Sequence, residues 1–186
     1  MAGARELDAR ARGKPIVRNR RGLILDLRQC VIVRVRSQSE ESKLLKVLLP
    51  VDGSPSAINA TRKLIDTLGW YRESPAIELC TVHLPLPKVP NMGQFVSKEM
   101  VQKYYADESE AMLKPSRDLL DAAGIACTVH RLVGPIAETI VERARQSGVD
   151  MIYMGTRGMS ALANMAMGSV TTRVLHLAHI PVVLIH

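Results

Sequence analysis

Three glycines and a serine near the C-terminal end of the chain have a spacing that suits phosphate binding. They read G-x2-G-x9-G-S and comprise Gly155, Gly158, Gly168 and Ser169. A glycine at the end of a strand lets the backbone approach a ligand closely, because it has no Cβ atom. Gly-Ser at the start of a helix offers free N–H groups and the positive end of the helix dipole. The pattern predicts a nucleotide cradle, although neither G-x4-G-K-[ST] nor G-x-G-x-x-G occurs in the chain.

The elements that must position these residues alternate between strands and helices. Short apolar runs predict strands at residues 44–51, 76–84, 125–133, 150–154 and 181–185. Helical spacing predicts helices at residues 55–68, 97–123, 135–146 and 168–179, the second of them kinked or split at Pro115. Such βαβ units require a parallel sheet with helices on both faces. We therefore predict an α/β protein with a doubly wound five-stranded parallel sheet.

A second loop is expected to lie beside the glycine loop. Asp52-Gly53-Ser54 follows the first strand, with Ser54 as a helix cap and Pro55 in the first helical position. In doubly wound sheets, ligands bind beyond the carboxyl ends of the strands, where the strand order reverses. With the first strand central and the fourth beside it, both loops flank that crevice. Asp52 is either a ligand contact there or simply part of a turn and capping sequence.

Several stretches together resemble the universal stress protein family. The run Leu48-Leu49-Pro50-Val51-Asp52-Gly53-Ser54 is similar to the family's first strand and loop, and Val82-His83-Leu84 to its second-strand signature. The segment from Met154 to Val170 matches the G-x2-G-x9-G-[ST] motif of the family's ATP-binding branch, and residues 180–185 resemble its dimer-forming last strand. The resemblance covers about residues 43–186.

The resemblance implies a Rossmann-like fold of the adenine nucleotide alpha hydrolase type, with strand order 3-2-1-4-5. It implies a cytoplasmic homodimer, joined through the C-terminal strand, that binds ATP with or without Mg²⁺. By position, Asp52 is implied to contact the ribose or adenosine end, and the backbone of Val82 to read the adenine edge. The rest of the implied binding set comprises Pro50, Val51, Met154, Gly155, Arg157, Gly158, Gly168, Ser169 and Val170. From the residues alone, Arg157 is either a phosphate partner or a solvated loop cation, and Ser169 is expected to be a phosphate-binding helix cap rather than a nucleophile.

The N-terminal extension differs in charge from the rest of the chain. Residues 1–42 contain ten Lys/Arg and five Asp/Glu, a net charge of +5, whereas residues 43–186 contain fifteen and thirteen, a net charge of +2. We predict a disordered basic arm at 1–42 and one universal stress protein domain at 43–186. Aromatic side chains for base stacking are scarce, which argues against nucleic acid as a partner, and no apolar run is long enough to cross a membrane.

The predicted function is nucleotide binding without dedicated catalysis. The chain has no Walker lysine and no magnesium-binding carboxylate set, which fast phosphoryl transfer needs, and its histidines and cysteines lack metal-site spacing. We expect an ATP-binding stress-response protein whose conformation or partners depend on the nucleotide, with at most slow hydrolysis. The alternatives are a nucleotide-independent dimeric scaffold and an ATP-dependent hydrolase.

Overall fold

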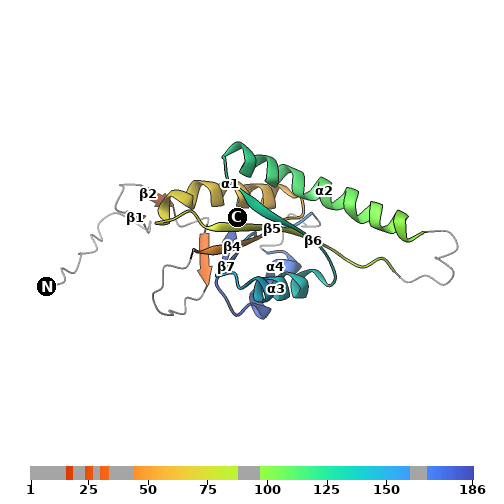
Figure 1. Cartoon of the computed structure of the whole chain (residues 1–186). Helices are drawn as coiled ribbons and strands as arrows, with labels where there is room; N and C mark the ends of the chain where they lie inside the picture. Colours follow the sequence, from red (N-terminus) through yellow and green to blue (C-terminus); the bar gives the residue numbers. More distant parts are fainter. Residues whose placement is uncertain (1–15, 19–23, 27–29, 34–43, 88–96, 160–166) are drawn as a thin grey trace.

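The computed structural model describes residues 16–18, 24–26, 30–33, 44–87, 97–159 and 167–186 (Figure 1). Its strands are Ile16–Arg18 (β1), Ile24–Asp26 (β2), Cys30–Val33 (β3), Lys46–Pro50 (β4), Ala76–His83 (β5), Cys127–Val133 (β6), Met151–Gly155 (β7) and Val182–Ile185 (β8). Its α-helices are Pro55–Thr67 (α1), Lys98–Ala122 (α2), Ile136–Ser147 (α3) and Ser169–Leu177 (α4), and the 3-10 turn Leu68–Trp70 follows α1.

The five strands β4 to β8 form the predicted parallel sheet. Neighbours in the order β6-β5-β4-β7-β8 are all paired in parallel. Numbered along the domain, this is the order 3-2-1-4-5, so the predicted fold class is confirmed. β4 is central, and the chain reverses its direction across the sheet between β4 and β7, which is where a ligand crevice is expected.

Hydrophobic side chains cover both faces of the sheet. Along β4, Val47 and Leu49 pack in a cluster with α1 and α2, whereas Leu48 packs in a second cluster with α3 and α4. In Figure 1 the first two helices lie on one side of the sheet and the last two on the other. A buried leucine or valine side chain stabilises the fold by about 1.5–3 kcal/mol, so both faces of β4 contribute to the stability of the domain. Because both faces are covered, the apolar residues of β4 form a continuous run and do not alternate with polar ones.

The turn from β4 into α1 has the predicted cap. Ser54 Oγ accepts a hydrogen bond from the Ala57 amide at 3.2 Å, and Pro55 occupies the first helical position. Gly53 has φ +77°, which an L side chain rarely adopts. A Cβ atom at Gly53 would also lie 3.3 Å from Cα of Met112, so α2 packs closely against this turn.

Pro115 lies inside α2, which continues through it from Lys98 to Ala122, so of the predicted kink or split the split does not occur. A proline removes one helical hydrogen bond and crowds the preceding turn. Leu113 and Leu120, on either side of it, are fully buried in the cluster with α1. Thr61 of α1 donates a hydrogen bond to Ser116 Oγ at 2.8 Å. These contacts hold α2 to the core on both sides of the proline, and they compensate for the lost bond.

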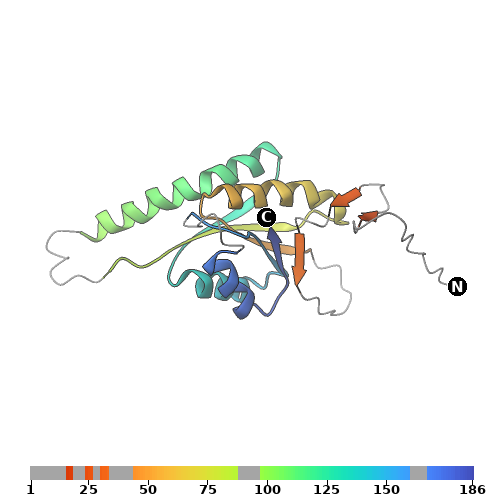
Figure 2. The ribbon, with the colours of Figure 1, turned by 180° about the vertical axis from the view of Figure 1, so that it is seen from behind.

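The N-terminal extension, for which the sequence predicts a disordered basic arm, contains three short strands among its described residues. β1 and β2 pair with each other, and β3 adds a sixth strand to the sheet, antiparallel to β8. Figure 2 shows the orange arrow of β3 running beside the blue arrow of β8 in the opposite direction. The edge of β8 that the resemblance assigns to a second copy is thus paired within this chain. Among the described residues, no helix is both long enough and apolar enough to span a bilayer.

Candidate functional site

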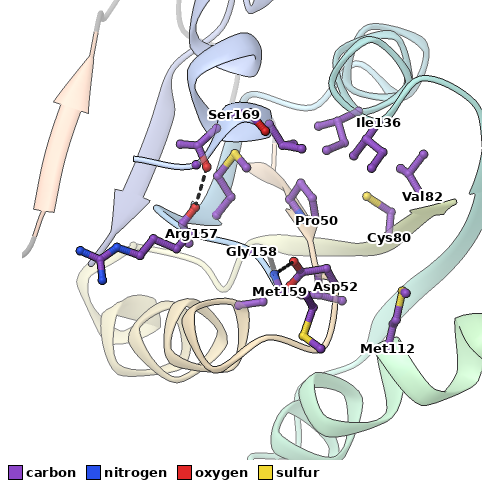
Figure 3. Close-up of a pocket in the computed structure, with 18 residues that line it drawn as sticks. Pro50, Asp52, Cys80, Val82, Met112, Ile136, Arg157, Gly158, Met159 and Ser169 are labelled. Atoms are coloured by element: carbon purple, nitrogen blue, oxygen red, sulfur yellow. Dashed lines mark hydrogen bonds between the residues drawn. The ribbon is translucent and has the colours of Figure 1, made fainter. Parts of the chain in front are cut away.

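A cavity of about 500 Å³ lies at the carboxyl ends of β4, β5 and β7 (Figure 3). Its walls come from the β4–α1 turn, the end of β5, Met112 of α2, the start of α3, the residues directly after β7 and the start of α4. All eleven residues of the predicted binding set line it, namely Pro50, Val51, Asp52, Val82, Met154, Gly155, Arg157, Gly158, Gly168, Ser169 and Val170. Segments that are more than one hundred residues apart in the chain therefore meet in one crevice.

Asp52 links the two loops that form the cavity. Its Oδ1 accepts a hydrogen bond from the Ser54 amide at 3.0 Å, and its Oδ2 accepts one from the Met159 amide at 3.1 Å. A Cβ atom on Gly158 would lie 2.7 Å from Asp52 Oδ2, so this contact requires a glycine. A carboxylate has about four acceptor positions. Asp52 therefore keeps capacity to accept hydrogen bonds from a ligand's hydroxyl groups.

Gly155 is needed for packing inside the protein. A Cβ atom there would lie 2.8 Å from both the carbonyl carbon and the oxygen of Ser56, which are backbone atoms of α1. The Arg157 amide donates to Ser56 Oγ at 3.3 Å, and Thr171 donates to the Gly155 carbonyl at 3.2 Å. The end of β7 is thus pressed against the start of α1. The sequence-based interpretation, in which this glycine makes room for a ligand, missed that constraint.

The start of α4 provides the anion-binding geometry. Gly168 is the helix cap and Ser169 is the first helical residue, so Ser169 is not the cap that was predicted. The first helical backbone bond runs from the Thr172 amide to the Gly168 carbonyl at 3.0 Å. The amides of Ser169, Val170 and Thr171 precede it and point out of the helix start, and Gly168 has no side chain to cap them. Together with the helix dipole, these amides favour a bound anion.

Arg157 contributes backbone rather than charge to the cavity. In Figure 3 its guanidinium points away from the other labelled residues. Its Nε is buried and has no hydrogen-bond partner among the described residues. Of the two interpretations of this residue, phosphate pairing is not supported in this conformation. Solvation of the whole side chain is not supported either, because part of it is buried.

The cavity has an apolar wall that was largely missed from the sequence, formed by Cys80, Met112, Ile136 and Ile140 beside the predicted Val82. The other lining residues outside the predicted set are Ala57, Met159 and Thr171. Burial raises the pKa of the Cys80 thiol to about 12, so it stays protonated and acts as part of the apolar surface.

The missed residues differ in how well the sequence marks them. Ile136 directly follows the Gly134-Pro135 turn at the end of β6, and Ile140 is one helical turn later, so their position at the carboxyl edge could have been inferred. Thr171 is in the first turn of α4, next to the predicted Ser169 and Val170. Met112 carries no such signal, because its place depends on how α2 packs across β5.

The arrangement suits a ligand with three chemically distinct parts. The apolar wall offers a surface for a flat ring, the Asp52 carboxylate can accept hydrogen bonds from hydroxyl groups, and the start of α4 is suited to an anion. Among the described residues that line the cavity, the charged ones are Asp52 and Arg157. In the described part of the chain, no three His, Cys, Asp or Glu side chains are grouped so as to hold a metal ion.

Comparison with known proteins shows the family of this chain. The model of the universal stress protein family matches residues 44–186. Universal stress protein MJ0531 of Methanocaldococcus jannaschii is 30% identical over 146 residues, which cover 78% of this chain and 84% of that protein. The structure of universal stress protein UspA from Lactobacillus plantarum is similar with a TM-score of 0.64 and 21% identity, over 78% of this chain and 100% of that one.

A universal stress protein solved in complex with cAMP also has this fold, with a TM-score of 0.55 and 22% identity over 76% of this chain and 97% of that chain. At identities of 21% and 22% the two solved structures establish only the shared fold. Membership of the family is established by the family model and by the relative from Methanocaldococcus jannaschii. The match begins at residue 44, two residues before β4, and includes every segment that lines the cavity. This chain therefore belongs to the universal stress protein family.

Proposed function

We propose that this protein binds an adenine nucleotide, with ATP as the ligand, and that the bound nucleotide controls its conformation or its partners. The observation that carries this function is the convergence of the predicted binding residues on one cavity with an apolar wall, a carboxylate and an open helix start. The related universal stress protein that was solved with cAMP supports an adenine nucleotide as the ligand class. The nucleotide-binding unit is residues 43–186, with residues 1–42 outside it.

Each part of the nucleotide has a matching part of the cavity. The adenine ring would lie against the apolar wall, where the backbone of Val82 is within reach of its polar edge. The ribose hydroxyls would donate to Asp52. The phosphates would lie at the amides of Ser169 and Val170, beside the loop that begins at Gly155. An anion at this position gains from the helix dipole, typically about 0.3–1 kcal/mol and more where water is excluded.

Binding is favoured over catalysis by the chemistry of the lining residues. Fast phosphoryl transfer needs cations on the phosphates and a group that positions the nucleophile. No lysine or histidine is among the described residues that line the cavity, and Asp52 is the one carboxylate among them. We therefore propose a nucleotide-responsive protein with at most slow ATP hydrolysis, and Mg²⁺ would enter with the nucleotide rather than through a protein site. A cytoplasmic location belongs with this function, as does homodimerisation through β8 in molecules whose β8 edge is not paired with β3.

Two measurements on the purified full chain test the proposed function. Acid extraction followed by chromatography identifies any nucleotide that was carried through purification. Calorimetric titration with ATP, and with adenosine in parallel, then measures affinity. Near-stoichiometric extracted ATP or a micromolar isotherm is expected. A chain that carries no nucleotide and gives no binding heat with ATP would instead support the nucleotide-independent scaffold. Product formation over many turnovers would favour the hydrolase.

A further inference from the structure

The edge of β8 is occupied by a strand from the chain's own N-terminal extension. β3 pairs with β8 along its whole length, from Cys30 opposite Ile185 to Val33 opposite Val182. An open strand edge presents unpaired N–H and C=O groups, to which another strand can add. β3 therefore occupies the position that a strand of another molecule would take.

The two edges of the sheet differ in how they are protected. β6, at the other edge, carries the exposed charge of Arg131, which discourages strand addition, and Arg131 forms an ion pair with Glu110 at 3.2 Å. β8 reads Val-Val-Leu-Ile and has no charge, proline or glycine. An uncovered edge of this composition would be a strong template for pairing. The sequence of β8 is thus typical of a strand whose outer edge is always paired with another strand.

The connection between β3 and β4 is long enough for this pairing within one molecule. Val33, Val182, Ile152 and Leu48 lie in one row of the sheet register, so β3 and β4 are three strand spacings apart. At about 4.8 Å per spacing the gap is about 14 Å. Residues 34–45 connect the two strands, and a chain of this length can reach about 40 Å when extended. A strand tethered in this way has an effective concentration in the millimolar range.

We propose that β3 is a displaceable cover over the edge of β8, and that a second copy of this chain is the partner that competes with it. Against other molecules at about 10 µM, the tethered strand has an advantage of about 100-fold in concentration. Pairing between two copies through β8 therefore requires both molecules to release β3. This inference concerns the edge of the sheet and does not depend on nucleotide binding.

The test compares three forms of the full-length chain. Proline has no amide hydrogen to donate to a strand ladder, and adjacent residues of an antiparallel strand donate to opposite sides. The double substitution Val31→Pro and Ile32→Pro therefore disrupts β3 whichever residue faces β8. The matched control, Ile16→Pro with Val17→Pro, makes the same chemical change in β1, which pairs with β2 and not with β8. Circular dichroism and thermal melting establish that all three forms are folded.

Sedimentation velocity over a range of concentrations measures self-association, and hydrogen exchange of residues 182–185 at the lowest concentration measures the cover itself. If β3 covers β8 in about nine of ten molecules, about one tenth of the molecules are open, and both copies of a dimer must be open at once. Disruption of β3 should therefore tighten dimerisation by about 100-fold. We expect the wild type and the β1 control to stay monomeric where the β3 variant dimerises, and β8 to exchange faster in the β3 variant.

Two results would overturn the proposal. One is identical self-association and identical exchange of β8 in all three forms. The other is a wild-type dimer that the β3 substitutions dissociate, since β3 would then bridge two copies rather than keep them apart.

Discussion

Replacing Gly168 by aspartate is expected to separate stability from phosphate binding. Gly168 caps α4 with φ −73° and ψ 154°, a conformation that any residue adopts. A Cβ atom there would lie 3.5 Å from the Thr156 carbonyl oxygen and 3.6 Å from Cα of Arg157, which are ordinary contacts. Aspartate is among the preferred helix caps, and its charge complements the helix dipole. We therefore expect Gly168→Asp to leave the free energy of unfolding unchanged or raise it by up to about 1 kcal/mol, a few tenths of which come from the cap and the rest from the charge at the helix start.

The same substitution should strongly weaken ATP binding. The introduced carboxylate would accept hydrogen bonds from the amides at the start of α4, which the phosphate is proposed to use. It would also place a negative charge about 5 Å from the phosphate, and this repulsion costs about 3 kcal/mol at an effective dielectric constant of roughly 20. That free energy corresponds to a loss of roughly 100-fold in ATP affinity.

Gly168→Asn is the matched control, because asparagine has nearly the same shape and caps helices equally well but carries no charge. Calorimetry with ATP and with adenosine on the wild type and both variants, each checked by thermal melting, gives the comparison. We expect ATP affinity to fall much further in the aspartate variant than in the asparagine variant, and adenosine affinity to be similar in all three. Equal ATP affinity in the two variants would refute the assignment of α4 as the phosphate site. An equal loss of adenosine and ATP would do the same.

Three further substitutions probe the site and the core. Gly155→Ala puts a Cβ atom 2.8 Å from the backbone of Ser56; it should destabilise the nucleotide-free protein by about 1–3 kcal/mol, and an unchanged melting temperature would contradict this. Gly158→Ala should displace the Asp52 carboxylate and lower ATP affinity more than stability, and equal affinity by calorimetry would contradict this. Burial, followed by the charge of Arg143, lowers the pKa of His130 below its ordinary value of 6.5. The neutral imidazole therefore contributes its full stabilisation above pH 6.5, and this stabilisation is lost as the pH falls through the pKa of the folded state. His130→Gln should flatten the loss of urea stability between neutral and mildly acidic pH, and parallel profiles would contradict this.

The position of the site followed from the sequence because topology determines it. Once the strands were assigned and β4 was placed at the centre, the loops after β4 and β7 had to meet at the carboxyl edge. Strand order alone, without any side-chain detail, therefore predicts that Asp52, Gly158 and Ser169 lie together, and all three line the cavity in the structure. The side-chain geometry was less accessible. The direction of the Arg157 guanidinium depends on which nearby atoms leave it room, and the spacing of a motif does not specify this.

Features that depend on packing between distant elements could not be read from the sequence. Met112 reaches the cavity because Leu113 and Leu120 anchor α2 on the sheet. The sequence of a helix with a broad polar surface does not indicate which of its residues will line a cavity. β3 was missed for a related reason. The run Cys30–Val33 is surrounded by arginines, and its stability as a strand comes from the edge of β8, about 150 residues later in the chain.

The glycines of the motif occupy their positions for different physical reasons. These reasons determine which of the glycines indicates a ligand. Gly155 and Gly158 both lie close to other atoms of the protein, Gly155 to the backbone of Ser56 and Gly158 to the carboxylate of Asp52. A scaffold that never binds a nucleotide would still need Gly155, whereas a side chain at position 158 would displace only the end of the Asp52 side chain. Gly168 is different, because a side chain fits there and a capping residue would make α4 more stable. Among the described residues no side chain caps the helix start, and an anion bound to its amides would compensate for the missing cap. Within the G-x2-G-x9-G-S motif, Gly168 is therefore the glycine that argues for a phosphate.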